Sequence, residues 1–251
     1  MKKSVLFLAS LAALASQAAT ALGSGDLAFT AINADEDGWA MVSFVDIAPN
    51  TTIYFTDNEW NGSAFNTGEG YHQWNSGAST IVAGTVIRFQ NIDVTGLSST
   101  FGTLSRASVS GSTNYGLSAS EDSVYAYTAS SVTATPTFIA AITTTAFTGA
   151  TTSGLLTNTG LSIGAGAIAL GGGAEYEEYI GARSGEANFA AYKPLVGNLA
   201  NWTNNPKDGN YAANVPNTTT FSVTAVPEPE TYALLMSGLL TVGFVARRRR
   251  G

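Results

Sequence analysis

The chain has 251 residues, with 18 acidic and 11 basic side chains, a net charge of −7 and no cysteine. Without cysteine, the sequence offers no disulfides, no thiol catalysis and no thiolate metal ligands. The negative charge argues against a nucleic-acid partner, because such binding depends on basic side chains that neutralise phosphates.

The first 21 residues have the three parts of a secretory signal peptide. Lys2 and Lys3 form the charged start, and residues 5–15 form an apolar stretch too short to span a membrane. The small residues 19–21 fit a cleavage site, so we expect cleavage after Ala21, with Ala18 as the alternative. The competing reading is an uncleaved N-terminal anchor. Either way, the sequence predicts export.

Residues 22–225, the ectodomain, are expected to fold as one all-β domain. They hold sixteen acidic and five basic residues, a net charge of −11. They are rich in Thr, Ser, Gly and Ala and poor in long helix formers, a composition that favours short strands and turns. A chain of this length can bury a core without disulfides. We therefore predict a β-sandwich.

Apolar and β-branched residues mark eight candidate strands. Both faces of residues 39–46 are apolar, which predicts a central strand. The expected strands are 27–32, 39–46, 52–56, 85–90, 123–128, 137–142, 166–170 and 219–223. One short helix is expected at 185–192, with Ser184 as its N-cap and Pro194 closing it. Residues 143–160 are a Thr/Gly-rich stretch that we expect to be an exposed loop.

The opening of the ectodomain resembles a β-rich module of secreted bacterial proteins. The resemblance rests on Gly25-Asp26, the following apolar strand, and residues 51–60, TTIYFTDNEW. The far end of that module is similar to residues 199–204, LANWTN, followed by a last strand at Phe221. The arrangement is distantly similar to a lamin-tail type of immunoglobulin-like (Ig-like) domain. The resemblance implies a sandwich and no particular reaction.

Two acidic loops are the best candidates for a calcium site. Residues 35–38 read DEDG and residues 57–59 read DNE, and Ca²⁺ prefers six to eight oxygen ligands. The spacing does not match an EF-hand, and Asp and Asn are also common in solvated turns. We expect no metal and no other cofactor.

The other candidate sites are also better explained without catalysis. His72 is the only histidine, so a Ser-His-Asp triad or a zinc site would depend on it alone. Glu175, Glu177 and Glu178 include a possible acid–base pair for glycoside cleavage, but they fit a solvated turn equally well. Exposed aromatic residues could stack on sugars, and otherwise belong to the core. These are Trp60, Tyr71, Trp74 and Trp202.

The last 26 residues, 226–251, have three parts of their own. Val226, Pro227, Glu228 and Pro229 form a stiff, extended start. Residues 232–246 then contain no charge and are mostly apolar. A helix over 231–246 would be about 24 Å long, somewhat short for a hydrocarbon core of about 30 Å. Four arginines follow, which the positive-inside rule keeps in the cytoplasm: Arg247, Arg248, Arg249 and Arg250.

This order of parts closely resembles the PEP-CTERM sorting signal of Gram-negative bacteria. The competing reading is an ordinary single-span membrane anchor. In the family, an exosortase, a membrane transpeptidase-like cysteine enzyme, recognises the tail, usually alongside exopolysaccharide production. The resemblance therefore implies an exosortase partner, a membrane-anchored intermediate, and a final place at the cell surface or in the extracellular matrix.

Together these observations predict a signal peptide (1–21), a β-sandwich ectodomain (22–225) and a sorting signal (226–251) with a short transmembrane helix. We expect a non-enzymatic surface or matrix protein associated with exopolysaccharide and biofilm, with no catalytic residues. The alternatives are a carbohydrate-binding module for exopolysaccharide and, third, an extracellular hydrolase.

Overall fold

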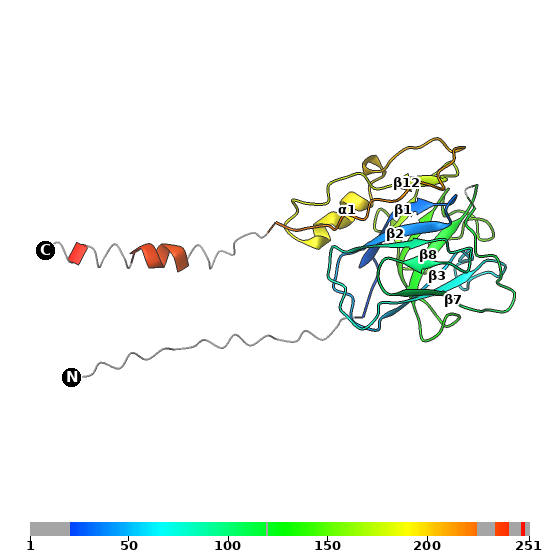
Figure 1. Cartoon of the computed structure of the whole chain (residues 1–251), viewed down its shortest axis with the longest axis horizontal. Helices are drawn as coiled ribbons and strands as arrows, with labels where there is room; N and C mark the ends of the chain where they lie inside the picture. Colours follow the sequence, from blue (N-terminus) through cyan, green and yellow to red (C-terminus); the bar gives the residue numbers. More distant parts are fainter. Residues whose placement is uncertain (1–20, 119, 225–233, 241–246, 249–251) are drawn as a thin grey trace.

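The computed structural model describes residues 21–118, 120–224, 234–240 and 247–248. The ectodomain contains two β-sheets packed face to face, which confirms the predicted all-β sandwich (Figure 1). The signal peptide and the Pro-Glu-Pro motif lie outside the described residues, apart from Ala21.

The smaller sheet has five strands, in the order β12-β1-β2-β5-β6. Its strands are antiparallel throughout. The strand β2 lies between β1 and β5, and all six of its residues are buried, as the two apolar faces of its sequence predicted. The strand bounds are β1 Leu27–Asn33, β2 Gly38–Ser43, β5 Val86–Gln90, β6 Ser98–Ser99 and β12 Tyr176–Glu178.

The larger sheet has seven strands, in the order β10-β11-β9-β8-β3-β4-β7. The pairs β10–β11 and β11–β9 are parallel, and the others are antiparallel. The bounds are β3 Thr52–Thr56, β4 Tyr71–Asn75, β7 Thr103–Arg106, β8 Ser123–Thr128, β9 Thr137–Thr143, β10 Ser162–Ile163 and β11 Gly166–Ala169.

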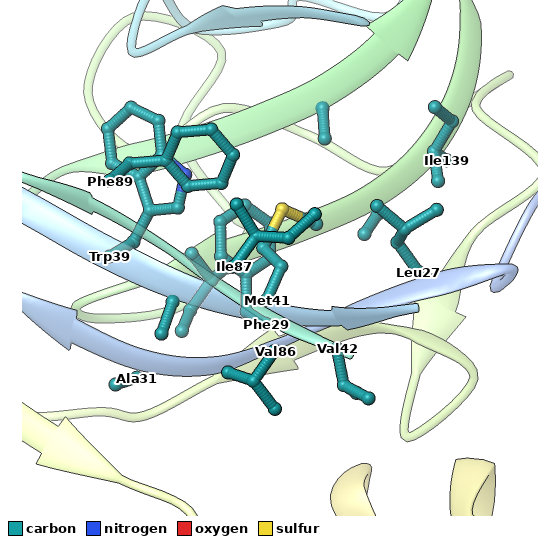
Figure 2. Packing of buried hydrophobic residues seen from close by; sticks show 14 of the residues in the cluster. Leu27, Phe29, Ala31, Trp39, Met41, Val42, Val86, Ile87, Phe89 and Ile139 are labelled. Atoms are coloured by element: carbon teal, nitrogen blue, oxygen red, sulfur yellow. The ribbon is translucent and has the colours of Figure 1, made fainter. Parts of the chain in front are cut away.

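The main core fills the space between the two sheets. Trp39 of β2 packs on Phe55 of β3, with ring centroids 5.2 Å apart, and Phe89 of β5 lies 4.9 Å from Phe55. Figure 2 shows Trp39 and Phe89 side by side, with Met41 and Ile87 further along the same layer. The aromatic side chains therefore join the sheets directly.

A second apolar cluster covers the outer face of the larger sheet. Tyr125, Tyr127 and Phe138 pack there against Trp60 and against the half-buried Phe65. Both faces of β8 are consequently buried.

The Thr/Gly-rich stretch 143–160 is less exposed than we expected. Phe147 and Leu156 pack on the outer cluster, and Ser153 and Gly154 are buried. The hydroxyl of Tyr125 donates a hydrogen bond to the Leu155 carbonyl oxygen at 3.1 Å. The loop is therefore a cover for the aromatic face of the larger sheet.

The predicted helix at 185–192 is wrong. Gly185 has φ +105°, which is outside the helical region, and a 3₁₀ turn begins only at Phe189. This turn, η1, spans Phe189–Tyr192 with Asn188 as its cap, and the helix α1 follows at Lys193–Val196. Pro194 lies in the first turn of α1, where its missing N–H costs nothing, so it begins the helix that it was expected to end.

The last predicted strand is also wrong. Residues 219–223 form no strand, and only an isolated parallel bridge joins Val223 to Glu186. A second 3₁₀ turn, η2, covers Leu199–Asn201 within the LANWTN stretch.

Candidate functional site

The C-terminal end of the ectodomain is held by hydrogen bonds up to its last described residue, Thr224. The Phe221 N–H donates to the Gly84 carbonyl oxygen, and the Thr224 N–H donates to that of Glu186, both at 2.8 Å. The Tyr192 hydroxyl donates to the Ser222 carbonyl oxygen at 2.6 Å. Thr224 therefore belongs to the folded domain.

The Phe221 side chain anchors this segment in the core. It is 1% exposed, and its ring lies 5.1 Å from Tyr192 and 5.8 Å from Tyr179. The Arg183 guanidinium lies over the ring at 5.0 Å, and one of its nitrogens donates to the Thr219 carbonyl oxygen. We call residues 219–224, with these contacts, the C-terminal clamp.

Most of the predicted sorting-motif residues lie outside the described part of the chain. These are Val226, Pro227, Glu228, Pro229, Arg249 and Arg250. Arg247 and Arg248 are described, and both are exposed. Residues 234–240 are helical, with exposed Leu and Met side chains. Among described residues, no helix has the length and apolar content needed to cross a membrane, and the predicted span 231–246 is described only in part.

The first acidic loop uses its carboxylates within the fold. Asp35 accepts a hydrogen bond from the Tyr211 N–H, and Glu36 pairs with Arg88 of β5. Asp37 accepts from the Leu117 N–H at 2.5 Å. Burial is the main cause that raises the pKa of Asp37 to about 6. Because the three side chains have separate partners, they do not form one ligand set.

Asp57 of the second acidic loop is in a different position. It is 4% exposed, and neither carboxylate oxygen has a hydrogen-bond partner among the described residues. It lines a narrow internal space with Trp39, whose indole N–H is also unpaired there, and with His72. This space has no room for a water molecule. Over the residues the structure covers, no group of three or more acidic or histidine side chains could hold a metal ion.

Asp57 has acidic neighbours as well as a dry environment. Burial, followed by repulsion from Asp122 and Glu69, raises the pKa of Asp57 well above its usual value. Burial also raises the pKa of Asp122 to about 7, although the N–H groups of Ser118 and Ser123 partly offset the effect. Carboxyl groups in this setting favour their neutral form.

His72 is placed as a core residue. It is 1% exposed, and its Nε2 lies 3.1 Å from the Ile92 carbonyl oxygen. Burial, reinforced by the Arg106 charge, lowers the pKa of His72 to about 4. Its ring also packs against Trp39 and Tyr115. A neutral, enclosed imidazole has no path to a substrate, which argues against the predicted alternative of a hydrolase using His72.

The three glutamates hold the segment 203–217 in place. Glu177 is 2% exposed, accepts hydrogen bonds from Thr203 and Asn205, and pairs with Lys207 at 3.3 Å. Glu175 accepts from the Gly209 N–H, and Glu178 accepts from the Asn217 N–H. Each glutamate has its own partners in this segment, which argues for a structural role.

The aromatic residues considered for sugar stacking belong to the interior. Trp60, Tyr71, Trp74 and Trp202 are all 5% exposed or less. The indole N–H groups of Trp60 and Trp74 donate to backbone carbonyl oxygens of Thr157 and Phe101. With the rings covered, these four side chains form no platform for a sugar.

One surface hollow, of about 480 Å³, lies beside α1 and β11. Small residues line most of it, with Phe44 at its wall. Its only charged lining residue is Lys193, whose Nζ lies 3.4 Å from Asp26. The hollow therefore has no carboxylate or histidine in its lining for general acid–base chemistry.

Sequence reasoning did not find the unpaired Asp57 or the partners of Phe221. The stretch TTTFSV indicated a strand, and its single aromatic residue was the available sign of an anchor. Nothing in the local sequence around Asp57 distinguishes it from a solvated turn residue.

Comparison with known proteins identifies the tail. Residues 225–250 match the model of the PEP-CTERM protein-sorting motif. No curated protein and no solved structure matches the chain. The motif marks an exported protein that an exosortase processes, through an intermediate anchored in the membrane at its C-terminal end. The motif begins one residue after the C-terminal clamp.

Proposed function

We propose that the ectodomain is a non-enzymatic building block of the cell surface or extracellular matrix, delivered there by exosortase processing of the tail. The main observation in support is the position of the sorting motif. A single sandwich ends at Thr224, and the motif starts at residue 225. The sandwich is thus the part of the chain that processing would release or transfer.

The interior of the ectodomain supports a structural role. His72 is buried and held neutral, the three glutamates hold a neighbouring segment, and the hollow beside α1 has Lys193 as its only charged group. A structural protein needs a stable, soluble fold and no reactive centre. The net charge of −11 serves solubility outside the cell.

We also propose that the protein is found together with exopolysaccharide. This part of the proposal rests on the resemblance of the tail to the PEP-CTERM sorting signal. Burial of the four candidate stacking residues disfavours sugar binding through those side chains. We therefore propose that the ectodomain is a matrix component that accompanies the polysaccharide. The alternative of a carbohydrate-binding module would require residues other than these four.

Cell fractionation tests this function. The full chain and a chain ending at residue 225 are expressed in cells with and without the exosortase. We expect the full chain at the surface only when the exosortase is present, and in the inner membrane when it is absent. The shortened chain should be exported in soluble form in both strains. If the full chain reaches the same fraction in both strains, exosortase sorting is refuted.

The absence of catalysis is tested separately on the purified ectodomain. Assays with ester, peptide and glycoside substrates should give no turnover above buffer. Activity that disappears in His72→Ala or Glu177→Gln variants that remain folded would overturn the non-enzymatic part of the proposal.

A further inference from the structure

The described fold fixes where the sorting motif leaves the domain. Thr224 is bonded to the Glu186 carbonyl oxygen, and two residues, Ala225 and Val226, lie between it and Pro227. Three residue steps span at most about 11 Å in a fully extended chain. While the clamp is closed, any partner that grips the Pro-Glu-Pro motif therefore lies within that reach of Thr224.

The surface around this point is made by segments that are distant in sequence. Gly84 bonds Phe221, and a side chain at Gly84 would meet the Phe221 carbonyl oxygen and the Phe189 ring. Gly84 has φ +87° in a turn that the Thr85 N–H closes onto the Val82 carbonyl oxygen. The turn therefore requires glycine, and Val82 begins this turn, two residues before the Gly84 that bonds the clamp.

The side chains at this point are apolar and accessible. Val82 is 60% exposed and Val223 is 39% exposed. Arg183 and Glu186 are half-buried and bond the clamp on either side of Val223, because their carbonyl oxygens accept from the N–H groups of Ser222 and Thr224. We call Val82, Arg183, Glu186 and Val223 the exit face. In Figure 1 the described chain of the ectodomain ends beside α1, at one end of the sandwich.

We propose that the exit face is a docking surface for the exosortase, held against it by the short tether between Thr224 and Pro227. This inference rests on the proposed function and goes beyond it, because it assigns folded residues to recognition. The two prolines of the Pro-Glu-Pro motif favour an extended backbone, and an enzyme that encloses such a segment must surround it with walls. With a tether of at most about 11 Å, those walls meet the exit face. The two exposed valines offer an apolar contact there.

The lipid bilayer is a less suitable partner for the exit face than the exosortase. The apolar segment of the tail starts near Tyr232, eight residue steps after Thr224. An extended chain of that length reaches up to about 29 Å, so the anchor leaves the domain free to stand away from the bilayer. The motif, which is much nearer, selects the enzyme as the occupant.

Site-specific photo-cross-linking in cells tests the proposal with the full chain. A photoreactive amino acid replaces Val82, and in a matched variant it replaces Val94. Val94 is also an exposed valine, at 45%, and follows the opposite end of β5. The exosortase carries an epitope tag, and its catalytic cysteine is changed to alanine so that the complex accumulates. Position 82 is informative because it is far from the tail in sequence.

We expect an adduct with the tagged exosortase from position 82 and at least tenfold less from position 94. Inserting ten Gly and Ser residues after Ala225 should abolish the difference, because the tether then no longer holds the face in place. Equal yields from the two positions, a lipid adduct alone, or an adduct that survives the insertion at full yield would each overturn the proposal. Failure of the proposed function would look different, since the unmodified chain would then not be processed by active exosortase.

Discussion

Replacing Phe221 with alanine should remove the anchor of the C-terminal clamp. The side chain is 1% exposed and packs against Tyr179, Tyr192 and Phe44, with centroid distances of 5.8, 5.1 and 6.4 Å. Truncation of a buried Phe costs about 3–5 kcal/mol, because apolar burial is lost and a cavity remains. A domain with an ordinary stability of about 5–15 kcal/mol would lose a large part of it.

Urea denaturation of the 22–225 fragment, followed by circular dichroism, measures this loss. With a slope of about 2 kcal/mol/M, the midpoint should fall by about 1.5–2.5 M. Val223→Ala is the matched control, since this neighbour is 39% exposed and should change stability by less than about 1 kcal/mol. If Phe221→Ala unfolds at the same urea concentration as the parent, the clamp is not part of the fold, and the reasoning about the exit face fails with it.

Three further predictions concern the ectodomain. Phe44→Ala should lower the free energy of unfolding by about 3–5 kcal/mol, because the Phe44 side chain is 5% exposed. The parent fragment should melt in one transition and give a β-type circular dichroism spectrum. A helical spectrum, two transitions or an unaffected variant would contradict a single sandwich. Asp57→Asn should stabilise the fragment at pH 8, because the raised carboxyl pKa of Asp57 makes the stability of the parent fall as pH rises from about 4 toward the folded-state pKa. The variant should therefore show a flatter profile of stability against pH over that range. Identical profiles for variant and parent would show that Asp57 is not an unpaired buried acid. EDTA and then Ca²⁺ should leave the melting temperature unchanged, because the carboxylates of residues 35–37 have separate partners; a reversible shift of several degrees would reveal a calcium site.

The strands that the sequence predicted well have strong alternation and clear turn residues at both ends. Thr52–Thr56 and Ser123–Thr128 have the predicted bounds. The strand 39–46 ends earlier, at Ser43, so Phe44 follows the strand although it was expected within it. Buried β-branched and aromatic side chains give a local signal that pairing with neighbours then reinforces.

The missed strands depend on partners that the local sequence does not reveal. Tyr71–Asn75 contains His, Gln and Asn, and becomes a strand through pairing with β3 and β7. Tyr176–Glu178 looked like a solvated acidic turn, but it pairs with β1 while Glu177 bonds distant Thr203 and Asn205. Tertiary pairing overrides weak local propensity in both cases.

The candidate sites show the same limit. The sorting tail was recognised from sequence because its signal is a linear order of parts, and the family comparison supports it. The state of Asp57, by contrast, depends on packing by Trp39 and His72 and on the charge of Asp122, which come from other strands and loops. No linear pattern carries that information.

Intact-mass analysis of the protein from the cell surface tests the central claim most directly. The account predicts a mass that lacks the residues after the Pro-Glu-Pro region, with the chain beginning after the signal peptide. A surface protein whose mass still includes Arg247 to Arg250 would contradict exosortase processing and the assignment of the tail as a sorting signal.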